Sequence, residues 1–179
     1  MSELRPAIFD PQHYPEDALQ ERTVLDACCG SKMFWFNKQD KRTLFLDIKK
    51  EGHFIRDSTS KNGGRFINIE PDLIGTFTNL PFDDESFYMV VFDPPHVIKK
   101  SKNSWVFLKY GELGVNWENV ISDGFRECFR VLKPNGTLIF KWSVTHIQLS
   151  KILALTDNQP LFGNKCGKRQ GTHWVVFIK

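Results

Sequence analysis

The sequence contains no long apolar run, and this absence bears on where the protein works. Nothing in its 179 residues approaches the roughly 18 consecutive apolar residues that a membrane-spanning helix needs. The first ten residues, MSELRPAIFD, lack the basic start and the apolar stretch of a signal peptide. We therefore expect a cytoplasmic protein that has no membrane partner.

Cysteines are few, and their spacing fits no common metal motif. Cys28, Cys29, Cys128 and Cys166 form no C-x-x-C pair. In the cytoplasm such residues are normally reduced thiols, and most are small buried side chains. A zinc site made by Cys28, Cys29, Cys166 and His173 is disfavoured because the spacing is wrong. The sequence thus predicts no metal.

Strong charge is also lacking. The formal net charge is +3 and the sequence pI is about 8.6, which permits a nucleic-acid partner without requiring one. Apolar residues make up 41% of the chain and charged residues 25%, as in an ordinary globular protein. The length suits one domain over residues 1–179. The oligomeric state is left open.

Short apolar segments alternate with segments of helical periodicity. The apolar ones are near-continuous, which is typical of strands buried on both faces of a parallel sheet; they cover 23–27, 43–48, 66–69, 88–92, 137–142 and 173–179. Helices are expected at 117–132, which ends at the turn 134–136, and around 147–153, with a short helix from Ser31 to Asp40. This alternation predicts an α/β fold with a doubly wound sheet. Residues 57–64 and 96–116 are expected to be loops, and the length of the second suggests a function.

Two aspartates follow buried strands at a spacing that suits a nucleoside. Asp26 ends the first strand, four residues before Gly30, and Asp47 ends the second strand. Ligands of open α/β sheets bind beyond the carboxyl ends of the strands, where a carboxylate can accept hydrogen bonds from both ribose hydroxyls. The chain has no G-x-G-x-x-G fingerprint and no P-loop, which hold phosphates. A cofactor with a ribose and no phosphate fits better, and S-adenosylmethionine is such a molecule.

Five stretches together resemble class I S-adenosylmethionine-dependent methyltransferases. They are VLDACCG (24–30), FLDI (45–48), NLPFDDESF (79–87), VVFDPPH (90–96) and ECFRVLKPNGTLIF (127–140). The resemblance implies a Rossmann-like sheet of seven strands, mostly parallel, with an antiparallel C-terminal strand at about 172–178. It also implies a cofactor site formed by Asp26, Cys28, Gly30, Asp47, Ile48, Phe77 and Asp93. The first loop departs from many family members because Cys28 and Cys29 replace glycines, and Thr76 stands where an acid often contacts the adenine.

The stretch DPPH suggests where the methyl group goes. Asp93 ends a buried strand, and Pro94 and Pro95 fix two φ angles and remove two N–H donors. The Asp93 carboxylate and the Pro94 carbonyl would form a rigid pair of acceptors for an exocyclic amino group. His96 would stack on a planar target. The stretch resembles the D/N/S-P-P-Y/F/W signature of amino-nitrogen methyltransferases, with histidine in place of the usual aromatic residue.

Basic and aromatic residues follow this motif. Lys99, Lys100, Lys102, Trp105 and Tyr110 would suit the phosphates and bases of a nucleic acid, although a solvated loop has the same composition. Three interpretations remain open: methylation of an exocyclic amino nitrogen of an RNA or DNA base, methylation of a small molecule or a protein side chain, and a non-catalytic cofactor-binding scaffold. The missing glycine fingerprint disfavours a nicotinamide oxidoreductase.

Overall fold

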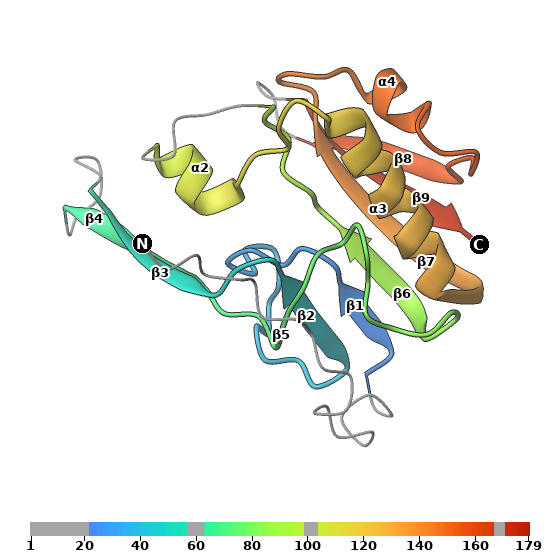
Figure 1. The fold of residues 1–179 in the computed structure, drawn as a ribbon, viewed down its shortest axis with the longest axis horizontal. Coiled ribbons are helices and arrows are strands. Elements are labelled where there is room, and N and C mark those ends of the chain that lie inside the picture. The colour runs from blue at the N-terminus through green and yellow to red at the C-terminus, as the bar shows by residue number, and fades with distance from the viewer. Residues whose placement is uncertain (1–21, 57–62, 99–103, 167–170) are drawn as a thin grey trace, which may run out of the picture.

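A seven-stranded sheet forms the centre of the molecule (Figure 1). The computed structural model describes residues 22–56, 63–98, 104–166 and 171–179. The order across the sheet is β5-β2-β1-β6-β7-β9-β8. The bounds of these strands are β1 Val24–Asp26, β2 Thr43–Asp47, β5 Leu73–Ile74, β6 Phe87–Phe92, β7 Leu132–Ser143, β8 Phe162–Cys166 and β9 Thr172–Ile178.

The strand directions confirm the predicted fold class. Strands β5, β2, β1, β6 and β7 pair in parallel, and β9 pairs antiparallel to β7. The outermost strand, β8, pairs antiparallel to β9. The sequence predicted the antiparallel strand at about 172–178 but not β8. The carboxyl ends of the parallel strands meet at one edge, where the candidate motifs lie.

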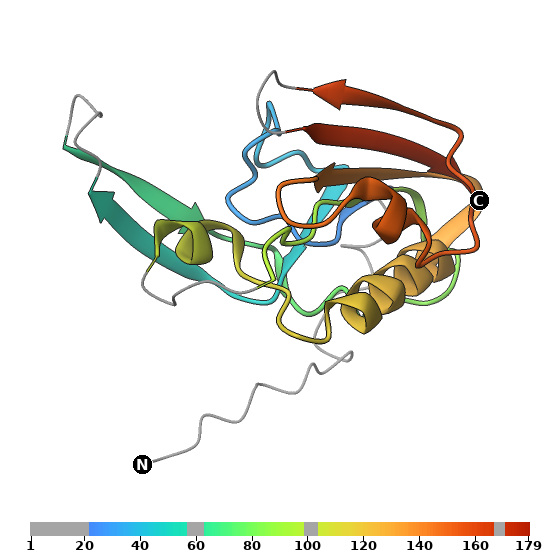
Figure 2. The same ribbon diagram turned by 90° about the horizontal axis from the view of Figure 1, so that it is seen from above.

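Helix α3 (Trp117–Val131) packs across one face of the sheet (Figure 2). Its buried stripe includes Ile121, Phe125 and Cys128, as the helical spacing predicted. The Phe125 ring lies 4.9 Å from the Phe140 ring of β7, which joins helix and sheet in one core. A second short helix, α4 (Leu149–Leu153), confirms the other predicted helix. No helix among the described residues is long and apolar enough to cross a membrane.

An ion pair at the end of α3 connects two of the sequence stretches, NLPFDDESF and ECFRVLKPNGTLIF. The Arg130 guanidinium donates hydrogen bonds to Glu127, to Asp84 and to the carbonyls of Leu80 and Phe82. Glu127 in turn accepts from the Leu80 N–H at 2.7 Å. The Arg130 hydrogen bond lowers the pKa of the Glu127 carboxyl, although burial opposes it. Charge-assisted bonds thus fix the NLPFDDESF segment to the helix.

The predicted helix from Ser31 to Asp40 is wrong. Residues 31–40 form turns, and Gly30 and Lys32 have φ angles of 50° and 53°, in the left-handed region that a right-handed helix cannot use. Tertiary contacts replace helical bonds here. The Trp35 indole N–H, for example, donates to Asp26 Oδ2 at 2.7 Å.

The segment 66–69 forms a strand, but it is not part of the main sheet. Strand β4 (Gly64–Ile69) pairs antiparallel with β3 (Glu51–Arg56), which the sequence did not predict, in a separate two-stranded ribbon. Figure 1 shows this ribbon projecting from the body of the protein. Only Ile67 and Ile69 alternate into the interior, so β4 is buried on one face rather than on both. The short strand β5 takes the place beside β2.

The long connection 96–116 contains a short helix. Helix α2 (Trp105–Tyr110) is capped by the Ser104 hydroxyl, which accepts from the Phe107 N–H. After α2 the chain returns to the end of β6, where the Leu113 N–H donates to the Val97 carbonyl at 2.8 Å. This excursion therefore begins and ends beside the DPPH stretch.

Candidate functional site

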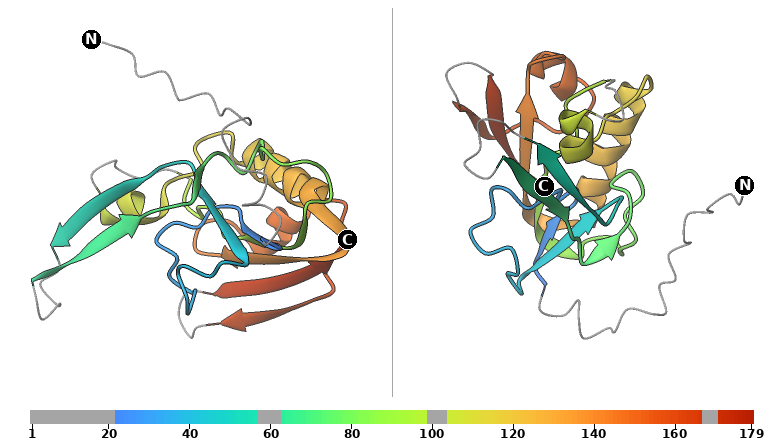
Figure 3. Two further views of the ribbon diagram at one scale, coloured as in Figure 1. Left: turned by 90° about the horizontal axis from the view of Figure 1, so that it is seen from below. Right: turned by 90° about the vertical axis from the view of Figure 1, so that its left-hand side faces the viewer.

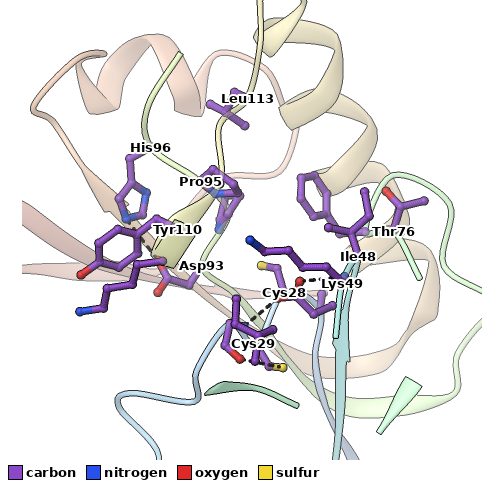
Figure 4. Close-up of a pocket in the computed structure, with 18 of the residues that line it drawn as sticks. Cys28, Cys29, Ile48, Lys49, Thr76, Asp93, Pro95, His96, Tyr110 and Leu113 are labelled. Atoms are coloured by element: carbon purple, nitrogen blue, oxygen red, sulfur yellow. Dashed lines mark hydrogen bonds and ion pairs between the residues drawn. The ribbon is translucent and has the colours of Figure 1, made fainter. Parts of the chain in front are cut away.

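A cavity of about 490 Å³ lies at the carboxyl ends of the parallel strands (Figure 4). Its wall combines residues from loops, helices and strands that the fold brings together. The lining residues are 27–31, 33–34, 47–49, 69, 75–78, 93–96, 109–113, 120 and 141. In Figure 4, Asp93, His96 and Tyr110 lie at one side of the cavity, and Ile48 and Thr76 lie at the other. The wall thus contains most of the residues that the sequence singled out.

Asp47 shapes the loop after β1 as well as lining the cavity. Its Oδ2 atom accepts from the Gly30 N–H at 2.8 Å, and Oδ1 accepts from the Lys49 N–H at 3.3 Å. Burial raises the pKa of Asp47, while these N–H donors favour the charged form and act against the rise. The Ile48 N–H also acts on this carboxylate, and a carboxylate, with about four acceptor sites, still has capacity for a further bond.

Asp26 lies behind the cavity wall rather than in it. The residue is fully buried and is not among the lining residues. Its two oxygens accept from the Trp35 indole and from the Cys28 N–H. Burial raises the pKa of Asp26 to about 7, and the Trp35 hydrogen bond partly offsets that rise. Asp26 therefore holds the first loop, and its Trp35 partner was not predicted from the sequence.

The other predicted cofactor residues lie in the wall. Cys28, Gly30, Ile48 and Phe77 all line the cavity, and the Phe77 ring packs 5.2 Å from the Phe92 ring of β6. Burial raises the pKa of the Cys28 thiol well above its ordinary value, so this sulfur is not a thiolate. All four cysteines are free, and the described residues contain no group of three or more side chains suited to a metal ion.

Lys141 is the main site residue that sequence reasoning missed. Its Nζ atom lies 2.5 Å from Asp93 Oδ2, and both side chains are mostly buried. The pairing follows from strand register: Phe92 of β6 stands opposite Phe140 of β7, so the next residue on each strand is Asp93 and Lys141. The Lys141 ammonium also lies 5.5 Å and 5.7 Å from the ring centroids of Phe34 and Trp174. A signal did exist, because a lysine within an apolar strand requires a partner.

No residue in the described part of the chain donates a hydrogen bond to the second oxygen of Asp93. Asp93 Oδ1 and His96 Nδ1 are buried and lack a hydrogen-bond partner among the described residues. His96 Nε2 lies 3.4 Å from Asp93 Oδ1 without forming a hydrogen bond to it. Burial lowers the pKa of His96, with Asp93 opposing and Lys141 adding to the effect, so the imidazole is neutral at pH 7. A buried acceptor without a donor is unfavourable unless a ligand supplies one.

The His96 ring is packed on the protein as well as lining the cavity. Its centroid lies 5.3 Å from the Trp142 ring at an interplanar angle of 76°, an edge-to-face contact. The side chain is 18% exposed. One edge of the imidazole is therefore fixed by Trp142, and the sequence had not predicted this contact.

The predicted substrate residues divide into three groups. Tyr110 lines the cavity from the end of α2. Trp105 begins the same helix, is 49% exposed, and lies outside the cavity wall with its ring 6.4 Å from that of Tyr110. Lys99, Lys100 and Lys102 lie outside the residues that the structure describes.

Comparison with known proteins gives matches in structure only. No protein-family model matches the chain, and no curated protein matches its sequence. A protein from Pyrococcus horikoshii OT3 has a similar structure, with a TM-score of 0.53 and 18% identity over 87% of this chain and 80% of that one. An S-adenosylmethionine-dependent methyltransferase from Methanosarcina mazei has a TM-score of 0.51 and 15% identity, over 93% and 97% of the two chains.

A third similar structure contains a bound ligand. Geranyl diphosphate methyltransferase, in complex with GPP and sinefungin, has a TM-score of 0.52 and 8% identity over 90% of this chain and 74% of that one. At these identities the likeness shows a common fold and leaves the chemistry to be argued from the site. The chain has the Rossmann-like fold of S-adenosylmethionine-dependent methyltransferases.

Proposed function

We propose that the protein is a methyltransferase that uses S-adenosylmethionine to methylate an exocyclic amino nitrogen of an RNA or DNA base. One observation carries the proposal: Asp93, followed by Pro94 and Pro95, lines the same cavity as Gly30 and Asp47 at the carboxyl edge of the sheet. A candidate acceptor site and a candidate ribose site therefore share one hollow. The predicted cytoplasmic location is part of the same proposal.

The side of the cavity near β2 suits the nucleoside. Asp47 would accept a hydrogen bond from the ribose hydroxyls with the acceptor capacity that its backbone donors leave free. Ile48 and Phe77 would flank the adenine with apolar surface, and Cys28 would contact the methionine part as a neutral thiol. Asp26 would act indirectly, by holding the first loop through Trp35.

The chemistry needs positioning more than proton transfer. S-adenosylmethionine, when bound, supplies a methyl group on a sulfonium, which is already a good leaving group. Asp93 Oδ1 would accept an N–H of the target amino group, which fixes the direction of the nitrogen lone pair. Lys141 holds the other oxygen, so the carboxylate is prevented from rotating. The ring of His96 or of Tyr110 would stack on the base.

A small acidic acceptor is a second candidate. Lys141 brings a mostly buried positive charge to the wall beside Asp93, and such a charge can bind an anionic group of a small molecule. The lysine already pairs with Asp93, which is why we favour the amino acceptor. The two candidates differ in where a transferred methyl group is found.

Transfer from labelled S-adenosylmethionine tests both candidates. The protein is incubated with methyl-labelled cofactor and separate pools of DNA, ribosomal RNA, transfer RNA, protein and small metabolites. We expect label in a nucleic-acid pool, and loss of at least a hundredfold in rate for Asp93→Ala. The matched control is Asp83→Ala, which removes an exposed aspartate in the loop before β6 and should leave the rate unchanged. Label confined to the metabolite or protein pool would refute the nucleic-acid assignment, and cofactor binding with no label in any pool would favour a non-catalytic scaffold.

A further inference from the structure

The ribbon of β3 and β4, which we call the arm (51–56 and 64–69), extends away from the main sheet (Figure 3). Its base belongs to the cavity described above. Ile48 and Lys49, just before β3, and Ile69, at the end of β4, all line that cavity. The Lys49 ammonium also donates to the Leu108 carbonyl of α2, which fixes the base of the arm to that helix. The arm therefore begins at the wall of the candidate active site.

The two faces of the arm differ in character. Ile67 and Ile69 point to the buried face, whereas Phe54 and Phe66 stand on the opposite face and are 62% and 66% exposed. These two phenylalanines are directly opposite each other in the strand pairing. Arg56, two residues after Phe54, projects from the same face and is exposed. The solvent face thus presents the phenyl rings of two paired positions and a positive charge.

Glycines let the two rings lie over the backbone of the arm. A Cβ atom at Gly52 would lie 2.7 Å from Phe66 Cζ, and one at Gly64 would lie 2.5 Å from Phe54 Cζ. Each ring therefore occupies the space above a glycine on the neighbouring strand and leaves its other side to solvent. Rings held in this way form a platform on which planar groups can stack.

The aromatic face continues into a basic hollow. A second cavity, of about 650 Å³, is lined by four lysines and by Asn68, which lies on the solvent face of the arm. The lysines are Lys32, Lys38, Lys41 and Lys50. We call it the lysine hollow. The three acids of the hollow each have a cation. Asp40 pairs with Arg42 and Asp72 pairs with Arg22. Glu70 lies 3.9 Å from the Lys50 ammonium, both side chains being exposed. Ser31 lines this hollow and the main cavity alike, so the two adjoin.

From this arrangement we propose that the arm and the lysine hollow bind a single-stranded nucleic acid whose bases stack on Phe54 and Phe66. The lysines of the hollow contact its phosphates, and the strand delivers a target base to the adjoining cavity. Aromatic platforms beside a basic groove are the usual means of holding single strands without reading a sequence. The inference rests on the proposed function and names the substrate as unpaired.

A second copy of the chain is a poorer occupant of this surface. Stable interfaces bury about 800 Å² on each partner, with an apolar centre free of charge. The exposed apolar part of this face comprises two rings beside Arg56 and the lysine hollow. Two copies meeting here would bring their lysines together, whereas a polyanion would neutralise them.

Fluorescence anisotropy with labelled 12-nucleotide single-stranded RNA and DNA tests the proposal without cofactor. At about 0.1 M salt we expect Phe54→Ala and Phe66→Ala each to weaken binding by about 5- to 150-fold, with little dependence on salt. The pair of substitutions Lys41→Ala and Lys50→Ala should instead reduce the salt dependence by about 0.7 per lysine on a log–log plot. The matched control for the rings is Phe162→Ala, which removes a phenyl group that is 63% exposed on the far edge strand.

The outcomes separate this proposal from the proposed methyl transfer. If wild type binds the strand and both phenylalanine variants bind it equally well, the arm is not the binding site. If wild type does not bind the strand, the proposal is also overturned. A dimer in sedimentation that these variants dissociate, with strand binding unchanged, would assign the face to self-association instead. Calorimetry with S-adenosylmethionine on the same variants should give wild-type affinity. If neither wild type nor any variant binds the cofactor while strand binding is intact, the proposed methyl transfer is refuted. The arm then remains a nucleic-acid site.

Discussion

At the scale of single residues, burial decides what each carboxylate does. Asp26 and Asp47 end adjacent strands and look alike in the sequence, yet only Asp47 reaches the cavity wall. Asp26 is fully buried, and its two oxygens accept hydrogen bonds from the Trp35 indole and from the backbone. One carboxylate is thus available for a ligand, and the other supports the loop that shapes the site.

The buried state of Asp26 predicts a dependence of stability on pH. Its pKa rises from 3.8 to about 7 on folding, so the folded protein binds more protons than the unfolded chain between these values. The contribution of Asp26 to the free energy of unfolding is therefore full below about pH 4. This contribution is lost as the pH rises through 7, and the loss is on the order of 4 kcal/mol. Asp26→Asn keeps an acceptor for Trp35 but cannot ionise. We expect the variant and wild type to be similar near pH 4, and the variant to be the more stable at pH 8.

Thermal unfolding of both proteins from pH 4 to pH 8 measures this difference. Asp40→Asn is the matched control, because its hydrogen bond with Arg42 lowers the pKa of Asp40 to about 2. The stabilisation that the Asp40 carboxylate provides is lost only as the pH falls through that value. The difference in stability between this variant and wild type should therefore stay constant over the range tested. A gap between Asp26→Asn and wild type that does not grow with pH would show that folding does not raise the pKa of Asp26.

Sequence reasoning found one half of the Asp93 pair and missed the other. Asp93 was recognisable because DPP follows an apolar strand, and local pattern suffices for that. Lys141 is 48 residues away and became its partner only through the register of β6 against β7. No local pattern encodes a register between strands, so contacts of this kind come from the structure.

At the scale of elements, α3 lies so close to the sheet because it has a glycine at the contact. A Cβ atom at Gly124 would lie 2.5 Å from Phe92 Cζ and 2.9 Å from Phe77 Cδ2. Phe92 is fully buried in β6, and Phe77 lines the main cavity. The helix therefore supports the cavity wall through two rings.

Gly124→Ala is expected to weaken both the fold and the site. Alanine gains up to about 1 kcal/mol of helix propensity, but overpacking of a core costs about 1–3 kcal/mol. We expect a net loss of about 1 kcal/mol or more in the free energy of unfolding. We also expect weaker binding of S-adenosylmethionine, because Phe77, which the added Cβ would displace, lines the cavity. Urea unfolding and calorimetry measure the two effects, with Ser122→Ala in the same helix as the control.

The elements that were predicted have strong local patterns. The stripe of α3 repeats over four turns, so its existence followed from periodicity. The helix predicted for residues 31–40 does not form because Lys32 adopts a positive φ, which its side chain does not predict. Strand β3, EGHFIR, alternates weakly and is exposed on one face, so it gave little signal before its pairing with β4 was seen.

At the scale of the whole molecule, the order of the strands explains why scattered motifs meet. β1 lies between β2 and β6, so the loops after these strands, with Gly30, Asp47 and Asp93, meet at one edge. The sequence predicted this convergence through its resemblance to a fold, and the sheet confirms the fold. The arm could not be predicted in this way, since it lies outside the seven strands and its aromatic pair depends on register.

Binding of the cofactor should stabilise the molecule as a single unit. If residues 1–179 form one domain, thermal unfolding will show one transition. A ligand present at a hundred times its dissociation constant adds about 2.7 kcal/mol, which for a chain of this size is about 5–10 °C. Asp47→Asn removes the charge that would pair with the ribose hydroxyls and should weaken binding by about 1.5–3 kcal/mol. The shift at the same cofactor concentration then falls to less than half, whereas Asp157→Asn, at an exposed position after α4, should keep the full shift. Equal shifts in both variants would show that the ribose is held elsewhere, and two separate transitions would contradict the single domain.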